Sequence, residues 1–356
     1  MNIKPLIIGN LVARLPIIQG GMGIGVSLSR LAGAVAKCGG IGIISGAQPG
    51  YLEKDFETNC VEANLRALKK HIKKAKEKAG NGIIGVNLMV AMNNYAEYVK
   101  ATIEAGADLI ISGAGLPSSL PKLTKDSSIK IAPIVSSLKG ARVIMKLWDR
   151  NYNIAPDMIV VEGPLAGGHL GFQKDKLQIE TKNFNQTIKD IIMEVKNMEE
   201  KHNKKIPVVV AGGIFDGNDI AKYLEIGASG VQMATRFVAT NECDAHENFK
   251  KAYLSCKTND ISIVKSPVGM PGRAIHNNFV KNTESNISKK VDKCYNCLIP
   301  CNPKETPYCI SAALINAVKG NLNEGLIFCG ENASKIKEIV PVKVLMDTLE
   351  KEILQY

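Results

Sequence analysis

Eight short apolar runs alternate with longer amphipathic or charged stretches up to about residue 240, and this alternation constrains the fold more than any other feature. We predict strands at Pro16–Gln19, Ile41–Ile44, Ile83–Asn87, Asp108–Ser112, Ile131–Val135, Met158–Val161, Pro207–Ala211 and Gly230–Met233. We expect helices near Ser29–Cys38, Thr58–Ala79, Asn94–Ala105, Leu138–Arg150, Glu180–Lys201 and Asp216–Ile226. Repeated strand–helix units build parallel sheets, and eight of them suggest an α/β fold of the closed (β/α)8 type, a TIM barrel.

The competing fold is an open, doubly wound sheet, whose first strand normally runs into a G-x-G-x-x-G turn. The chain has glycines at 20, 21, 23 and 25 there, and this spacing does not match. Glycine instead follows many of the expected strands, at Gly20, Gly46, Gly113, Gly163 and Gly212. Loops of that kind are typical of the mouth of a barrel, so we favour the barrel.

The pattern changes beyond about residue 240. We therefore divide the chain into a barrel of residues 1–242 and a C-terminal extension of residues 243–356 that packs on it and carries a cysteine cluster at 294–309. The extension begins with a helical stretch at 245–256, continues through a loop at 266–273, and has two helices after the cysteines. It has too few apolar strands to form an independent domain.

Composition excludes several classes of protein. Hydrophobic residues make up 45% of the 356 residues, which is ordinary for a globular enzyme. The net charge of +11 comes from dispersed lysines and aromatic residues reach only 5%, so we expect no nucleic-acid partner. No signal peptide or membrane span is apparent, and nine cysteines, an odd number, favour a reducing cytoplasm.

The segment from Val160 to Phe172 contains the strongest candidate for chemistry. A run of β-branched residues ends in Gly and Pro, with Glu162 at its end and His169 behind the pair Gly167-Gly168. Glycine lets a ligand approach the backbone, and histidine titrates near neutral pH. His169 is thus a candidate general base, although a histidine that only caps a turn explains these residues equally well.

Two further loops suggest a phosphate site. Gly212 and Gly213 follow the seventh expected strand, while Ala234 and Thr235 follow the eighth. In TIM barrels a phosphate is frequently bound between these two loops, by backbone N–H groups and a short helix. Tight turns explain either loop alone, but they explain the pair less well.

Several linked motifs make the chain resemble the nitronate monooxygenase family, also called 2-nitropropane dioxygenases, and its relatives, the flavin-dependent enoyl-acyl-carrier-protein reductases II. The matching segments are 16–22, 85–88, 162–171 with its A-G-G-H core, 211–214, 232–237 and 272–274. The resemblance covers roughly residues 1–280 and implies a barrel that holds FMN at its mouth.

The resemblance also implies roles for individual residues. His169 matches the family's catalytic histidine, and the flavin-contacting positions correspond to Met22, Asn87, Glu162, Gly167, Gly213, Gln232, Met233, Ala234 and Thr235. Many relatives have Gln in place of Glu162. A carboxylate there would disfavour an anionic reduced flavin unless it is protonated or paired.

Three functions stay open at this point. The preferred one is an FMN-dependent nitronate monooxygenase with His169 as catalytic base, and the second is an enoyl-acyl-carrier-protein reductase II that takes electrons from NAD(P)H. The small-molecule substrate would accordingly be a nitronate or an enoyl thioester, the latter on an acidic carrier protein. The third is a barrel that binds flavin or a phosphorylated ligand without turnover. The residues leave the oligomeric state open, a homo-oligomer included.

Cys294, Cys297, Cys301 and Cys309 follow the spacing C-x2-C-x3-C-x7-C. Thiolates this close in sequence can hold zinc or an iron–sulfur cluster. The spacing matches neither common ferredoxin pattern, and reduced thiols in a proline-containing loop explain it somewhat better. From sequence alone we therefore expect no metal site.

Overall fold

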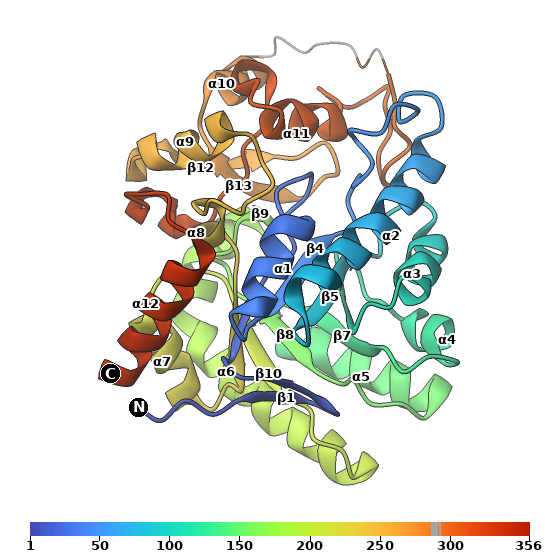
Figure 1. The fold of residues 1–356 in the computed structure, drawn as a ribbon, viewed down its shortest axis with the longest axis vertical. Helices are drawn as coiled ribbons and strands as arrows, with labels where there is room; N and C mark the ends of the chain where they lie inside the picture. Colours follow the sequence, from blue (N-terminus) through green and yellow to red (C-terminus); the bar gives the residue numbers. More distant parts are fainter. Residues whose placement is uncertain (286–290, 292) are drawn as a thin grey trace.

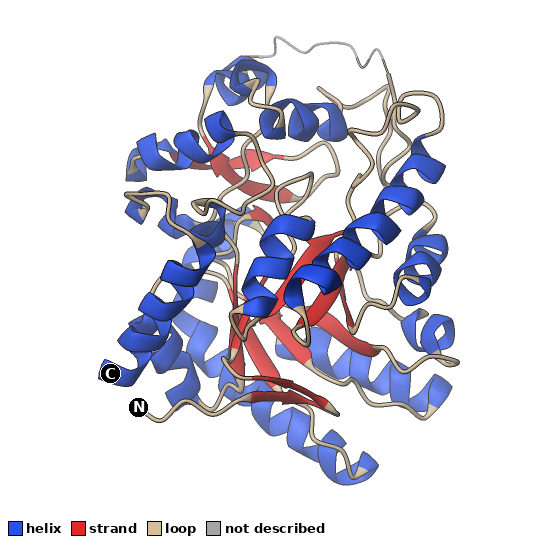
Figure 2. Cartoon of the chain, in the orientation of Figure 1, coloured by secondary structure: helices blue, strands red, loops and turns tan. Residues whose placement is uncertain are grey.

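Eight parallel strands close into a barrel in this computed structural model, which describes residues 1–285, 291 and 293–356 (Figures 1 and 2). The barrel strands are β3 (Ile17–Gln19), β4 (Ile41–Ser45), β5 (Ile83–Met89), β6 (Leu109–Gly113), β7 (Lys130–Val135), β8 (Ile159–Glu162), β10 (Val208–Ala211) and β11 (Gly230–Met233). Pairing of Val231 with Ile17 closes the ring. The predicted (β/α)8 fold and its eight strands are confirmed.

Helices surround the strands. They are α1 (Ser29–Lys37), α2 (Cys60–Ala79), α3 (Tyr95–Glu104), α4 (Leu120–Thr124), α5 (Leu138–Tyr152), α6 (Leu177–His202) and α7 (Gly217–Ile226). The six predicted helices are all present, and the sequence reading missed only the short α4 among them. The strand β11 is followed by α8 (Thr235–Val238), a single turn.

The barrel has two apolar layers because successive side chains of a strand point to opposite faces. Ile18, Ile43, Ile111, Val160 and Val209 belong to the inner cluster. Their sequence neighbours, such as Ile17, Ile44, Ile110, Val161 and Val210, belong to the larger cluster shared with the helices. Runs that are apolar at every position are therefore required here, since both faces are buried.

A hairpin that the sequence reading did not recognise contributes to the inner cluster. Strands β1 (Leu6–Ile8) and β2 (Leu11–Ala13) pair antiparallel, and Leu6 and Ile8 are fully buried in the inner cluster. The turn between them is Gly9-Asn10, with Gly9 at φ +60°. Figure 1 shows β1 at the end of the barrel opposite to β9. The buried Leu6 and Ile8 side chains therefore close the barrel interior at that end.

The extension covers the other end of the barrel and also returns to its wall. It contains α9 (Glu247–Ser255), β12 (Ile261–Lys265), β13 (Pro271–Ile275), α10 (Asn278–Glu284), α11 (Ile310–Val318) and α12 (Val342–Gln355). The extension also contains 3-10 turns at Thr258–Asp260, Leu322–Glu324 and Glu331–Lys335. A further 3-10 turn, Lys174–Lys176, precedes α6 in the barrel. Since α12 packs against α7 and α1, it supplies the barrel helix that the short α8 does not.

The expected loop at 266–273 is only partly a loop, which corrects that prediction. β12 pairs antiparallel with β13, and β13 pairs with β9 (Gly168–His169). Gly269, at φ +82°, lies in the turn that joins β12 to β13. This three-stranded sheet fixes the loop after β8 against the extension (Figure 2).

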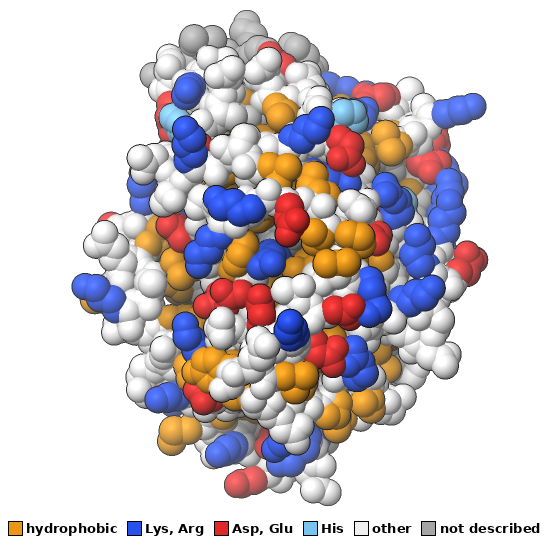
Figure 3. All heavy atoms as spheres, turned by 60° about the vertical axis from the view of Figure 1, so that its left-hand side comes forward, with side chains coloured by type: hydrophobic (Ala, Val, Ile, Leu, Met, Phe, Trp, Pro, Cys, Tyr) orange, Lys and Arg blue, Asp and Glu red, His pale blue; other side chains and the backbone are white. Residues whose placement is uncertain are grey.

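The surface carries its charge in dispersed form. On the face shown in Figure 3, basic and acidic side chains are interspersed, with small apolar patches between them. Within the described residues, no helix is both long and apolar enough to cross a membrane.

Candidate active site

One large cavity of about 550 Å³ lies at the carboxyl ends of the barrel strands, where βα loops of a TIM barrel carry functional residues. The structure brings all the predicted site residues to its wall. These are Met22, Asn87, Glu162, Gly167, His169, Gly213, Gln232, Met233, Ala234 and Thr235. Segments up to 213 residues apart in the sequence thus meet at one place.

His169 lies in β9, in the loop region that follows β8. Its Nε2 is 2.6 Å from Oγ of Ser266, and its ring meets the ring of Phe328 edge-on at 5.1 Å between centroids. Burial lowers the pKa of His169 to about 4. The imidazole is consequently neutral at physiological pH and has a lone pair available for a proton.

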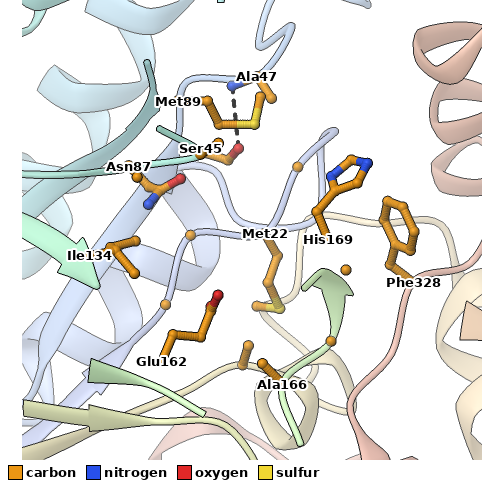
Figure 4. Close-up of a pocket in the computed structure, with 18 of the residues that line it drawn as sticks. Met22, Ser45, Ala47, Asn87, Met89, Ile134, Glu162, Ala166, His169 and Phe328 are labelled. Carbon is orange, nitrogen blue, oxygen red and sulfur yellow. Dashed lines mark hydrogen bonds between the residues drawn. The ribbon is translucent and has the colours of Figure 1, made fainter. Parts of the chain in front are cut away.

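Glu162 is the last residue of β8, and its side chain points into the cavity toward Met22 (Figure 4). Burial raises its pKa to about 7, because an ionised carboxylate loses its hydration there. Within the described part of the chain no hydrogen bond or ion pair to the Glu162 carboxyl is recorded. Burial thus shifts this carboxyl toward its protonated form, which bears on the question of charge that the sequence raised.

Arg273 fixes the shape of the loop after β8. Its Nη1 donates to the carbonyl oxygen of Pro164 at 2.9 Å and to that of Ala166, and its Nε lies 2.8 Å from a carboxylate oxygen of Glu331. The Arg273 side chain is buried, and its guanidinium presents several donors in one plane, which suits neighbouring carbonyls. Arg273 is thus a positioning residue for the segment that carries Gly167 and His169.

The loops after β10 and β11 adjoin each other as expected. Gly212 and Gly213 have φ of +94° and +77°, which only glycine adopts readily. Asn332 Nδ2 donates to the Gly213 carbonyl at 2.6 Å, and Gly330 N donates to Thr235 Oγ1 at 2.9 Å. The extension therefore packs against the loops after β10 and β11 and forms a third wall of this part of the cavity. The sequence did not indicate this contact.

Gln232 and Asn87 stand on either side of the glycines after β3. A side chain on Gly21 would place its Cβ 2.4 Å from Cβ of Asn87, and one on Gly20 would approach Gln232 Cγ to 3.0 Å. The Gln232 Oε1 atom is buried and has no hydrogen-bond partner among the described residues. A buried acceptor without a partner is costly, so a ligand that donates a hydrogen bond is expected at this point.

The cavity also has an outer arm that sequence reasoning missed. Its walls come from α2, the loop after β5, α3 and the extension, and they include Cys60, Met92, Tyr98, Leu298, Ile310, Leu314 and Leu326. Most of these side chains are apolar, and they lie on segments with no family motif. Only the folded chain brings them together.

Ser266 and Phe328 are further site residues that the sequence did not single out. Ser266 begins the segment 266–273 that was expected to be a loop, but no sequence pattern there indicates that its hydroxyl pairs with a histidine 97 residues away. Phe328 lies close to Gly168 and Gly272, and a Cβ on Gly272 would come within 2.8 Å of its ring.

Comparisons with known proteins agree with this geometry. The family model described as nitronate monooxygenase matches residues 4–352. A probable nitronate monooxygenase of Staphylococcus saprophyticus is 27% identical in an alignment of 306 positions that covers 79% of this chain and 81% of that protein.

Two other similarities broaden the picture. A (3aS,4S,5R,7aS)-5-hydroxy-7a-methyl-1-oxo-octahydro-1H-indene-4-carboxyl-CoA dehydrogenase of Rhodococcus jostii is 26% identical over 269 residues, or 76% of this chain, and the match spans only 65% of that protein. Among solved structures, FabK from Thermotoga maritima superposes with a TM-score of 0.71 at 27% identity, covering 96% of this chain and 93% of that one.

Proposed function

The chain belongs to the nitronate monooxygenase family of oxidoreductases, and from this premise we propose that it is an FMN-dependent enzyme that oxidises nitroalkanes and their nitronates. The single observation that carries the proposal is the position of His169, which is half-buried at the wall of the cavity with its Nε2 held 2.6 Å from Oγ of Ser266. FMN would supply the electron-transfer chemistry, and the chain's own residues bind, orient and move one proton.

The residues present fit FMN. The unpartnered Oε1 of Gln232 can accept a hydrogen bond from the flavin ring system. Gly20 and Gly21, which also line the cavity, have no side chains and so allow the Gln232 and Asn87 side chains to lie against the backbone after β3. The positive φ of Gly212 and Gly213 and the adjacent Thr235 hydroxyl suit the phosphate end. Met22, Asn87, Gly167, Met233 and Ala234 complete the proposed FMN site.

His169 would act as the base for a neutral nitroalkane. We assign the tautomer in which Nε2–H donates to Ser266, so that Nδ1 carries the lone pair that accepts the substrate's α-proton. Ser266 and Phe328 hold the ring in place. Because burial lowers the pKa of His169 to about 4, the ring is not protonated to imidazolium at neutral pH and is free to accept a proton, while its low basicity reduces the driving force for the transfer.

The charges on the cavity wall favour uptake of the neutral form of the substrate. Among the described residues that line the cavity there is no lysine or arginine, whereas two glutamates, Glu162 and Glu331, are present. A nitronate anion bound in the cavity would have no cationic side chain to pair with, and burying its unpaired charge would cost free energy. A neutral nitroalkane, deprotonated only after binding, avoids that cost.

The outer arm of the cavity favours a second candidate, an enoyl-thioester reductase that takes electrons from NAD(P)H. Met92, Leu298 and Leu314 line a space that an acyl chain could fill. The similarity to FabK points in the same direction. For such a substrate an acidic carrier protein is the proposed partner, since the chain has a net charge of +11.

Anaerobic mixing of the FMN-loaded enzyme separates the two candidates. Rapid bleaching of the flavin absorbance by a nitroalkane or nitronate, with slow or no bleaching by NADPH or NADH, is expected. Rapid bleaching by NADPH and none by nitro compounds would overturn the first candidate in favour of the second. Purified protein that is colourless and takes up no FMN would defeat both, and would leave a ligand-binding barrel without turnover.

A further inference from the structure

The four clustered cysteines surround a second, smaller cavity in the extension. Cys294, Cys297, Cys301 and Cys309 all line this cavity, whose volume is about 60 Å³. Cys294 is exposed and the other three are half-buried, and none is in a disulfide. A chain segment of only 16 residues thus folds back on itself so that four cysteines line one small space.

All four cysteines belong to one short segment and line the same small cavity, so their sulfurs are available to a single ligand there. Free thiols gain little from lying together, whereas a metal centre displaces their protons and uses all four sulfurs.

Two hydrogen-bond donors beside the cavity could stabilise negatively charged sulfur. The backbone N–H of Asn296 donates to Cys294 Sγ at 3.3 Å. The Thr306 hydroxyl also lines the cavity, and its Oγ1 is buried without a hydrogen-bond partner in the described part of the chain. N–H and O–H donors to sulfur are the contacts that tune iron–sulfur clusters.

We propose that Cys294, Cys297, Cys301 and Cys309 bind an iron–sulfur cluster. A zinc ion needs its four sulfurs about 2.3 Å from one point. Among the described residues, no group of three or more His, Cys, Asp or Glu side chains is arranged to hold one metal ion. A cluster of iron and sulfide is wider, so its cysteines stand around a space instead of converging on a point.

The size of the cavity agrees with this choice. A single water needs roughly 10–15 Å³ of such space, so the cavity of about 60 Å³ has room for several atoms before the loop adjusts. This assignment revises the expectation from sequence, in which the unfamiliar spacing counted against a metal. The spacing differs from those of ferredoxins, but the fold still brings the four thiols to one place.

The cluster would stiffen one wall of the large cavity. The segment 295–299 is held against the loop after β5, because Asn93 N donates to the Cys297 carbonyl at 3.2 Å and Ile299 N donates to the Ala91 carbonyl at 2.8 Å. Tyr295 and Cys297 line both cavities. The cysteine site is nevertheless independent of the FMN site, since it shares none of the proposed FMN-contacting residues.

The test is metal and sulfide analysis of the full-length protein, purified without air or reconstituted with ferrous iron and sulfide. We expect iron and acid-labile sulfide in equal amounts, about two or about four of each per chain, with an electron paramagnetic resonance signal after reduction. The variants Cys297→Ser and Cys301→Ser should lose both elements. Cys38→Ser, which changes a half-buried cysteine on the barrel wall, should keep them.

Several outcomes would overturn the assignment. Zinc in place of iron, iron without sulfide, or no metal after reconstitution each contradict it, as does full retention of iron and sulfide in the Cys297→Ser and Cys301→Ser variants. Circular dichroism of each variant shows whether it has folded, and the wild-type analysis decides the question even if a variant has not. Flavin content is measured separately, so failure here does not affect the proposed function.

Discussion

Nε2 of His169 lies 2.6 Å from Oγ of Ser266, across 97 residues of sequence, because β9 and the hairpin of β12 and β13 form one small sheet. This pair connects the barrel's proposed catalytic group to the extension. If His169 is the base, Ser266 sets its tautomer and orientation. Substitutions of the two residues should then change the kinetics by different amounts and in different ways.

We expect His169→Ala to lower kcat on nitroalkanes by about a hundred- to ten-thousand-fold, the usual contribution of a general base. Turnover of a pre-ionised nitronate should fall much less, because its proton is already gone. Steady-state kinetics with both forms of one substrate measure the difference. His276→Ala is the matched control, since His276 pairs with Glu284 at 2.8 Å and does not line the cavity. Equal losses on both substrate forms would contradict the assigned role.

Ser266→Ala should lower kcat by about two- to tenfold, as expected for one hydrogen bond of roughly 0.5–1.5 kcal/mol. It should also change the pH at which activity is lost on the acidic side, because the histidine loses a neighbour that fixes its tautomer. Ser266→Thr, which keeps the hydroxyl, should restore part of the rate. A pH profile identical to that of the wild type, with a loss only in thermal stability, would make Ser266 merely structural.

Glu162→Gln should flatten the dependence of stability on pH near neutrality. The pKa of Glu162 in the folded protein is about 7, above its ordinary value of 4.5, so the folded state holds this proton more tightly than the unfolded chain. The stabilising effect is fully present below pH 4.5 and is lost as pH rises through 7. Thermal melts between pH 5 and pH 8.5 compare the two proteins.

The wild type should lose more Tm over this range than the variant, and the variant should bind FMN with less dependence on pH. Glu331→Gln is the control, because Glu331 also lines the cavity but is paired with Arg273. Parallel pH curves for the wild type and Glu162→Gln would show that Glu162 stays ionised throughout.

Much of the barrel could be predicted from sequence because it depends on local signals. Strands such as Val208–Ala211 are apolar at every position, which a strand buried on both faces requires. The hairpin at the closed end had a signal as well, the Gly9-Asn10 turn between two short apolar runs, which is a known pattern for two-residue turns. It was missed because three-residue strands are too short for periodicity to show.

The rest depends on contacts between distant segments. Family motifs pointed to His169 and Glu162, but nothing near either residue indicated Ser266 as a partner of the histidine. Nor did the sequence indicate that the Glu162 carboxyl has no hydrogen-bond partner among the residues that the structure describes. The same holds for α12, whose apolar face is visible in the sequence while its position between α7 and α1 is not. Burial and pairing are properties of the folded chain, so the pKa values and the outer arm of the cavity followed only from the structure.

Gly213→Ala tests whether the phosphate of FMN binds in the corner between the loop after β10 and Thr235. The test distinguishes the effect of backbone strain on stability from an effect on FMN binding. Gly213 has φ +77°, and an added Cβ would lie 2.8 Å from Cβ of Leu165. Gly106 has nearly the same φ, +80°, but no atom of the described residues lies within 4 Å of a Cβ added there. Both alanine variants should lose about 1 kcal/mol of stability from the positive φ.

Only Gly213→Ala should also weaken FMN binding, by at least about tenfold, because Leu165 and the neighbouring backbone must shift at the corner formed with Thr235. Titration of the apoprotein with FMN, followed by quenching of flavin fluorescence, measures the dissociation constant, and thermal melts measure stability. If Gly213→Ala and Gly106→Ala lose equal stability and bind FMN equally well, the phosphate does not sit at the loop after β10, and the corner is then only a tight turn.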